Sequence, residues 1–225
     1  MSPGMIISGC SIPPAGKGSI AGNPYLNKNK GNILSELEVV SSLMAPSIRS
    51  QIYKKIDDSV GILSLTTKYD NLLMWSHYAN DHRGMVIGFD EKHPFFNQTT
   101  TEDDELRHLR KVSYSKKRSN LSLNNLDGLA GYMVKSLEWE YEQEWRMLMP
   151  LVDADKVEYI GNQSVYLFKI LFSAIKTVYI GARSGGAYKE DVNNILSANP
   201  KLFHVELVAL KTDDKEFSLI PEAVD

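Results

Sequence analysis

The sequence predicts an α+β fold in a single domain, with a mixed or antiparallel sheet flanked by helices. Short apolar runs of strand length recur between residues 60 and 220, and few segments between them have helical spacing. The composition supports a buried core, because 43% of the 225 residues are apolar and 24% are charged. Wholesale disorder is thereby excluded.

The N-terminal segment differs from the rest of the chain. Residues 1–33 hold six of the fifteen glycines and four of the nine prolines, and they lack hydrophobic periodicity. This composition predicts a flexible leader, followed by the domain at residues 34–225. Residues 33–45 have apolar side chains at helical spacing, and Pro46 breaks that helix.

The remaining elements follow from short local patterns. We expect helices at about residues 71–79, 123–138 and 187–197, the first capped by Asp70 or Asn71. Residues 181–186 are expected to form a strand-to-helix turn, because they lack the Gly-Lys-Ser/Thr ending of a phosphate loop. The expected strands are residues 60–65, 84–90, 109–115, 144–149, 165–170, 175–180, 203–210 and 216–220.

Charge and cysteine content restrict the partners and the compartment. A net charge of −3 argues against a general nucleic-acid binder, and the basic cluster at residues 111–118 fits a solvated strand end. No apolar stretch approaches the roughly 18 residues of a membrane span. Cys10 follows Ile-Ser-Gly as in a lipoprotein cleavage site, but no basic residue precedes Lys17, so export is not predicted. With one cysteine, a reducing compartment is favoured and a cytoplasmic protein is expected.

The first segment that indicates a site is residues 70–90. On a helix, Met74, His77, Tyr78 and Asp81 gather on one face, and a carboxylate four residues after a histidine can orient its imidazole ring. Gly84 is expected to supply the freedom for the turn that follows. The same residues also fit a plain core helix, with satisfied aromatic tips and a buried histidine.

The second segment is residues 135–146. If it is extended, Glu140, Glu142 and Glu144 share one strand face and repel one another unless cations or a ligand compensate them. If it is helical, Glu142 pairs with Arg146, and a switch from helix to strand near residues 139–144 is a third arrangement. We expect residues 75–78 to pack beside strand 144–149, with His77 or Tyr78 reaching Glu144 or Arg146.

Four blocks carry a resemblance to a known family. They are Leu-Met-Trp-Ser-His-Tyr-Ala at residues 73–79, His-Arg-Gly at 82–84, Gly-Phe-Asp at 88–90, and Trp-Glu-Tyr-Glu-Gln-Glu-Trp-Arg at 139–146. Together they resemble DUF2971, a bacterial family of unknown function, over about residues 58–210. Members of that family begin with an aromatic-rich strand and an Asn-Asp-Pro-like motif. Residues 1–57 lack this pattern, so the chain is expected to be N-terminally shortened or diverged.

The family pattern is similar to that of ADP-ribosyltransferases, and this similarity implies roles for particular residues. Glu144 is the implied catalytic carboxylate, stabilising an oxocarbenium-like transition state, and Tyr78 and Trp75 hold the ring of NAD. Arg146 or His82 is the implied pyrophosphate contact. The full set of candidates is catalytic Glu144, His77 and Tyr78, with ligand-binding Trp75, Ser76, His82, Arg83, Glu142 and Arg146. No metal site is expected, because the histidines lack zinc-site spacing.

Three functions remain open at this stage. The first is an enzyme of a defence or toxin system that handles a nucleotide or a related small molecule such as NAD. The second is a non-catalytic module with a degenerate site that binds a protein partner. The third is a nuclease-like metal site built from the glutamates. The sequence does not decide whether the chain is an enzyme.

Overall fold

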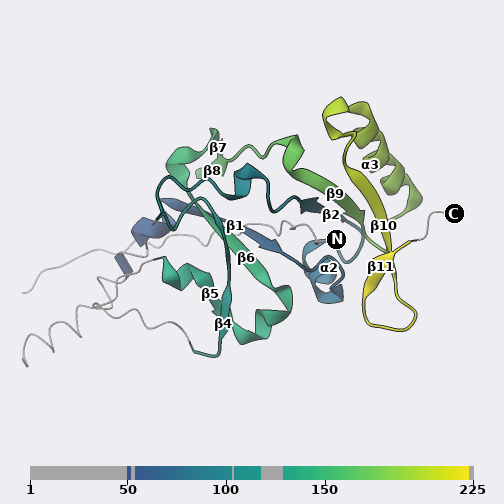
Figure 1. The fold of residues 1–225 in the computed structure, drawn as a ribbon, viewed down its shortest axis with the longest axis horizontal. Helices are drawn as coiled ribbons and strands as arrows, with labels where there is room; N and C mark the ends of the chain where they lie inside the picture. The colour runs from purple at the N-terminus through teal and green to yellow at the C-terminus, as the bar shows by residue number, and fades with distance from the viewer. Residues whose placement is uncertain (1–49, 52–53, 103, 118–128, 223–225) are drawn as a thin grey trace, which may run out of the picture.

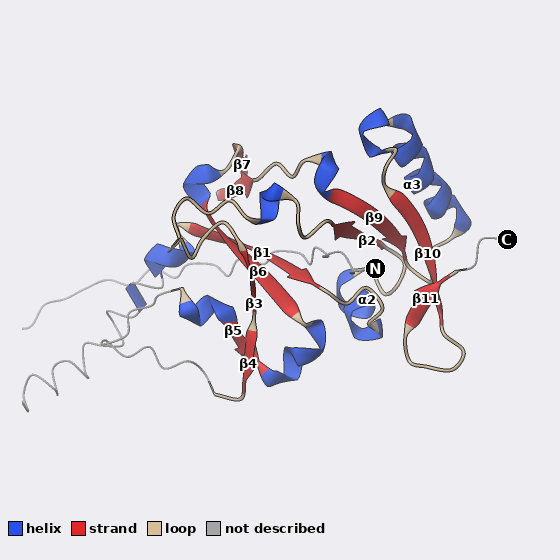
Figure 2. Cartoon of the chain, in the orientation of Figure 1, coloured by secondary structure: helices blue, strands red, loops and turns tan. Residues whose placement is uncertain are grey.

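The computed structural model describes residues 50–51, 54–102, 104–117 and 129–222. The expected leader at 1–33, the expected helix at 33–45 and residues 123–128 of the second expected helix lie outside them. The described part is α+β, as predicted, with two main sheets and few helices (Figures 1 and 2). Helices α2 (Leu72–Tyr78) and α3 (Gly186–Ala198) are described in full, and residues 50–51 and 54–57 are also helical. The strands are β1 (Val60–Thr66), β2 (Met85–Phe89), β3 (Leu109–Lys111), β4 (Ser113–Ser115), β5 (Val134–Ser136), β6 (Glu144–Pro150), β7 (Lys156–Ile160), β8 (Gln163–Leu167), β9 (Ile175–Ile180), β10 (Glu206–Thr212) and β11 (Leu219–Pro221).

The first sheet is antiparallel, in the order β1-β6-β3. Side chains alternate between its two faces, so Trp145, Met147 and Met149 point to one side and Glu144 and Arg146 to the other. The apolar side packs into a core with Leu65, Phe89 and Phe96. The opposite side holds the buried Leu148 and the polar groups of Glu144 and Arg146. Strand β6 therefore contributes to the apolar core and to a largely buried polar layer at once.

The second sheet is mixed, in the order β11-β10-β9-β2, and α3 connects the parallel strands β9 and β10. Val192 of α3 packs on Val178 and Ile180 at one face of this sheet. Helix α2 packs on the other face, where Trp75 joins a cluster that includes Leu210. In Figure 1, α2 lies between the two sheets, and α3 lies on the outer side of the second.

Most of the expected elements are present. The strands expected at 60–65, 84–90, 144–149 and 175–180 correspond to β1, β2, β6 and β9, and the helices expected at 71–79 and 187–197 to α2 and α3. The strand expected at 165–170 overlaps β8 only at residues 165–167. Asn71 caps α2, accepting from the backbone N–H groups of Leu73 and Met74. The 181–186 segment is the expected strand-to-helix turn.

Four predictions of secondary structure were wrong. The strand expected at 109–115 is broken at Val112 into β3 and β4, which join different sheets. From residue 129 on, the helix expected at 123–138 is instead short 3-10 turns around β5, because Gly131 weakens a helix and β4 offers β5 a partner strand. Strands β10 and β11 begin later than expected, at Glu206 and Leu219.

The second of two small β-ladders, β7-β8, includes a strand that was not predicted. All positions of β7 are exposed, although Val157 and Tyr159 alternate with Lys156 and Glu158, and this alternation was the available signal. Within the described residues, no helix is long and apolar enough to cross a membrane.

Candidate functional site

Helix α2 presents three candidate residues to solvent and buries a fourth. Ser76, His77 and Tyr78 are exposed, with 42% of Tyr78 accessible. Trp75 is 1% exposed, and its indole N–H donates to the Tyr69 carbonyl oxygen at 2.6 Å. The ring implied as a nicotinamide contact therefore lies in the core, with its polar tip satisfied.

The loop after α2 places His82 and Arg83 away from the exposed helix face. The helix ends at Tyr78, and residues 80–82 have positive φ, so Asp81 does not lie over His77 as expected. Asp81 instead pairs with Arg83 at 2.8 Å and with Arg183 at 2.9 Å. The expected orientation of His77 by Asp81 was therefore wrong.

The same loop packs against the turn after β9. The His82 carbonyl oxygen accepts from the Arg183 backbone N–H at 2.9 Å, and the Ser184 hydroxyl donates to the Arg83 carbonyl at the same distance. Gly84 does not provide a left-handed turn; a side chain there would press on the backbone of Ala79. The positive φ values fall on Asn80, Asp81 and His82 instead.

The second segment adopts the helix-to-strand switch that was one of the three alternatives. A 3-10 helix covers Leu137–Glu142, Gln143 takes a left-handed conformation, and β6 starts at Glu144. As a result, Glu142 and Glu144 are 3% and 4% exposed, whereas Glu140 is exposed. Two carboxylates, separated by one residue, are thus buried, and each needs compensation.

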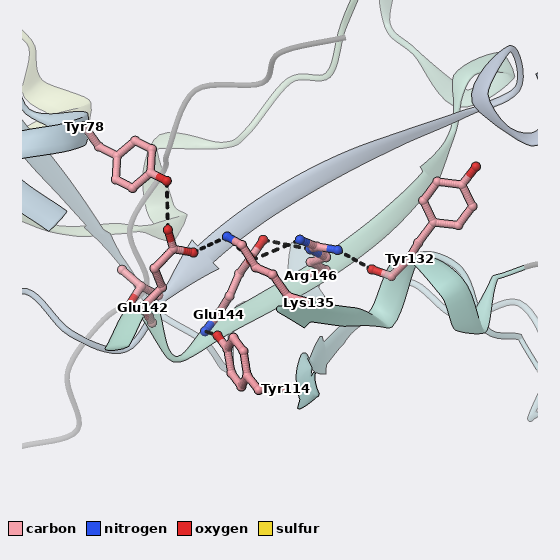
Figure 3. A network of polar contacts seen from close by, with 8 residues as sticks. Tyr78, Tyr114, Tyr132, Lys135, Glu142, Glu144 and Arg146 are labelled. Carbon is pink, nitrogen blue, oxygen red and sulfur yellow. Dashed lines mark hydrogen bonds and ion pairs between the residues drawn. The ribbon is translucent and has the colours of Figure 1, made fainter. Parts of the chain in front are cut away.

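The compensation comes from a network of polar contacts (Figure 3). Arg146 donates to both oxygens of Glu144, from Nε at 2.7 Å and from Nη2 at 3.1 Å. Lys135 lies between the two carboxylates and donates to Glu144 at 3.0 Å and to Glu142. The Tyr78 hydroxyl donates to the other oxygen of Glu142 at 2.8 Å. Together Tyr78, Lys135, Glu142, Glu144 and Arg146 are called the ion network below.

Two backbone contacts hold the ion network in place. The Glu144 backbone N–H donates to the Tyr114 hydroxyl at 2.7 Å, and Arg146 donates to the Tyr132 carbonyl oxygen. These contacts tie β6 to β4 and to the turn before β5. Glu144 and Arg146 are therefore held by neighbouring segments as well as by their own strand (Figure 3).

The charges of the ion network are consistent with this geometry. Burial alone raises the pKa of Glu144, but the hydrogen bond and charge of Arg146, with Lys135, outweigh it and hold the pKa below its usual value. Burial likewise lowers the pKa of Lys135, but the two carboxylates reverse this and raise it. Burial and the bond to Glu142 raise the pKa of the Tyr78 hydroxyl. Near neutral pH the network therefore contains ionised Glu144 and Lys135 and a neutral Tyr78.

A family comparison covers this same region. Residues 74–147 match the family model described as "Protein of unknown function (DUF2971)". The resemblance to DUF2971 is confirmed over these residues. The match is shorter than the expected 58–210, but it includes every member of the ion network. Searches of curated proteins and of solved structures each gave no significant match.

Beside the ion network, the DUF2971 segment forms a group of neighbouring rings. His77 lies 6.1 Å from Tyr78 and 6.3 Å from Trp139, measured between ring centroids, and Trp139 lies 6.0 Å from Tyr141. The Lys135 ammonium lies 4.9 Å from the Trp139 ring, a cation–π distance. His77, Tyr78 and Trp139 are exposed. We call His77, Tyr78, Trp139 and Tyr141 the aromatic cluster.

The two blocks of the DUF2971 segment therefore meet, but through a different pair of residues from the one expected. The contact joins Tyr78 to Glu142, not His77 or Tyr78 to Glu144 or Arg146. The Arg83 guanidinium, one of the expected donors, pairs with Asp81 instead, and the carbonyl oxygens of His82 and Arg83 accept from Arg183 and Ser184. Sequence reasoning missed Lys135 and Trp139; the lysine stood at the start of the second block, and its charge was the available signal.

The acceptor capacity of Glu144 limits what it can do chemically. A carboxylate has about four lone-pair positions. Two are taken by Arg146 and one by Lys135. A ligand hydroxyl can therefore use only the remaining position of Glu144 unless it replaces one of these donors. In the described part of the chain, no group of three or more His, Cys, Asp or Glu residues is arranged to hold a metal ion.

Proposed function

We propose that this protein binds a nucleotide-type ligand whose planar ring stacks on the aromatic cluster. The observation that carries the proposal is the exposure of His77, Tyr78 and Trp139 as neighbouring rings on a rigid support. Aromatic side chains are stabilised by burial, so a group of them on the surface favours a partner with a flat face. Stacking on such rings contributes about 1–3 kcal/mol per base and tolerates different bases.

The ion network acts as the support of the cluster in this proposal. Glu142 holds the Tyr78 hydroxyl, and Lys135 lies against Trp139 while it bridges the two buried carboxylates. Rings fixed in this way lose little conformational freedom when a ligand binds, which favours affinity. The glutamates then serve mainly to hold the rings in position.

Titration of the protein with adenosine, AMP, ADP-ribose and NAD, followed by tryptophan fluorescence and calorimetry, tests this proposal. Trp139→Ala is expected to weaken binding at least about tenfold, from the lost stacking. Tyr159→Ala is the matched control, because Tyr159 is a 76% exposed ring on β7. Absence of binding at millimolar ligand, or equal binding by Trp139→Ala, would contradict the proposal.

A second candidate is ADP-ribosyl transfer or NAD hydrolysis, with Glu144 as the catalytic carboxylate. The position of Glu142 and Glu144 directly behind Tyr78 favours it, because a carboxylate near a bound nicotinamide riboside stabilises positive charge on the ribose. Glu144→Gln should then abolish NAD turnover while NAD still binds. If the wild-type protein binds NAD without consuming it, the chain is a non-catalytic binding module, which the engagement of Glu144 by Arg146 and Lys135 favours.

We also propose a biological setting, a compartment and a kind of partner for the protein. A bacterial defence or toxin system, the cytoplasm as compartment, and a protein partner of a binding module all fit a chain with one cysteine and a nucleotide-type ligand. Co-purification of the tagged full chain, with and without NAD, tests the partner. A stable partner that Trp139→Ala releases would place the aromatic cluster at the interface.

A further inference from the structure

We propose that Arg110 binds an oxyanion, a phosphate group, on the polar face of the β1-β6-β3 sheet. The inference rests on the proposed function only in naming phosphate, the anionic part of a nucleotide, as the ligand. The binding of an oxyanion by Arg110 follows from a separate set of observations, and none of them involves the aromatic cluster.

The first observation is that two donors of Arg110 are unused. Among the residues that the structure describes, Nε and Nη2 of Arg110 are the buried side-chain nitrogen or oxygen atoms without a hydrogen-bond partner. Its remaining nitrogen, Nη1, lies 3.6 Å from a carboxylate oxygen of Glu105, whose side chain is 46% exposed. Native proteins satisfy nearly all buried polar groups, and leaving charged donors unpaired is costly. These two N–H groups therefore indicate a partner of opposite charge.

The second observation is the geometry of the two donors. Nε–H and Nη2–H lie on one edge of the planar guanidinium group, where they can hold two oxygens of a carboxylate or phosphate side by side. Arg146 lies directly opposite Arg110 in the β3–β6 register, so both side chains point to the same face. Arg146 uses this same edge to bind both oxygens of Glu144. Arg110 thus repeats the arrangement of Arg146, but no carboxylate binds its Nε and Nη2 edge, and its contact with Glu105 is at Nη1.

The third observation is the charge balance on this face. Arg110 and Arg146 are like charges on adjacent strands, a pairing that destabilises a sheet unless anions compensate it. Glu144 is shared between Arg146 and Lys135, and Glu142 also contacts Lys135. Three cations therefore face two buried carboxylates and the exposed Glu105, which lies at Nη1 of Arg110. An oxyanion on Nε and Nη2 would compensate the buried edge of Arg110 directly, with Glu105 left at Nη1.

The test measures anion binding by the full chain. Inorganic phosphate and pyrophosphate are titrated by thermal shift and by ³¹P NMR, with acetate and chloride at equal ionic strength as controls. Phosphate and pyrophosphate are expected to raise the unfolding midpoint saturably, and more than acetate or chloride do. Arg110→Met should weaken phosphate binding at least about tenfold, and Arg110→Lys should restore only part of it, because an ammonium lacks the two-donor edge. Arg183→Gln, an exposed arginine with the same change in charge, should bind phosphate like the wild type.

A further readout separates an anion site from a structural role. Without phosphate, Arg110→Met should unfold at the same temperature as the wild type or higher, since it removes unpaired buried donors. A midpoint several degrees lower would show that Arg110 stabilises the fold and would overturn the inference. So would equal phosphate binding by wild type and Arg110→Met, or the lack of any saturable phosphate effect.

Adenosine distinguishes this inference from the proposed function, because it has a ring and no phosphate. If adenosine binds and phosphate does not, the oxyanion site is wrong and the aromatic site stands. If phosphate binds through Arg110 and adenosine does not bind, the reverse holds.

Discussion

Replacing Lys135 by methionine removes the cation that Glu142 and Glu144 share. Glu144 keeps Arg146, but Glu142 keeps only the Tyr78 hydroxyl as a side-chain donor among the contacts described. Breaking a buried ion pair by removing one partner costs about 3–5 kcal/mol. The Lys135 side chain is 22% exposed, so water moderates the loss, and we expect the low end, about 3 kcal/mol. For a chain of this length, that is a drop in midpoint of about 6–12 °C.

Urea denaturation followed by tryptophan fluorescence, with calorimetry for the midpoint, measures this loss. Lys156→Met is the matched control: Lys156 pairs with Glu158 at 2.6 Å, but both side chains are largely exposed, so about 0–1 kcal/mol is expected. Adding Glu142→Gln to Lys135→Met should recover at least about 1 kcal/mol, because it removes a carboxylate left without its cation. If Lys135→Met loses no more than Lys156→Met, the ion network does not stabilise the fold as argued.

Three more predictions concern the loops and the dependence on pH. Gly181→Ala should destabilise the fold by about 3 kcal/mol or more, because its methyl group would lie 2.7 Å from the carbonyl carbon of His82. Gly186→Ala is the control: it has open space around the new methyl group and should stabilise the fold by about 0.5 kcal/mol. Urea denaturation compares the two variants. Burial lowers the pKa of His82, so the unfolded chain binds the proton more readily and stability falls as the pH drops below about 6.5; His82→Asn should flatten this dependence between pH 7 and 5 in thermal melts. Backbone N–H donors, that of Thr100 first, lower the pKa of Asp104 to about 2, which gives stability that is present above about pH 4 and lost as the pH falls through 2. The difference in midpoint between wild type and Asp104→Asn should therefore close over that range, and a constant difference would refute this.

Local signals allowed much of the fold to be predicted from the sequence. Asn71 indicates the start of α2, because a side-chain cap bonds to backbone groups within three residues of it. The apolar run of β9 begins at Ile175 and ends at Ile180, as expected. Strand β7 is short and wholly exposed, but the alternation of Val157 and Tyr159 with Lys156 and Glu158 was a signal that the prediction overlooked. The break at Val112 was missed because it depends on the pairing of β4 with β5, which lies about 20 residues further along the chain and is not visible in the local sequence.

The candidate site was predictable only in part, for the same reason. The glutamates and aromatic residues of the second block were visible, and so was the need for compensating charge. Which cation supplies it depends on the pairing of β4 with β5, which brings Lys135 to Glu142 and Glu144. The spacing of His77 and Asp81 was misleading, because α2 ends before its next turn forms.

The pairing of β1 with β6 also sets the order in which the chain can fold. Thr66 pairs with Glu144, so β1 leaves the ribosome about 80 residues before its partner. At about 5–20 residues per second, Leu63 and Leu65 wait roughly 4–16 s for the strand that covers them. Contacts between distant segments slow folding, because the entropy of closing a long loop is lost before the stabilising contacts form. The first sheet therefore forms late in synthesis, and until then its apolar strand is exposed to chaperones and to other nascent chains.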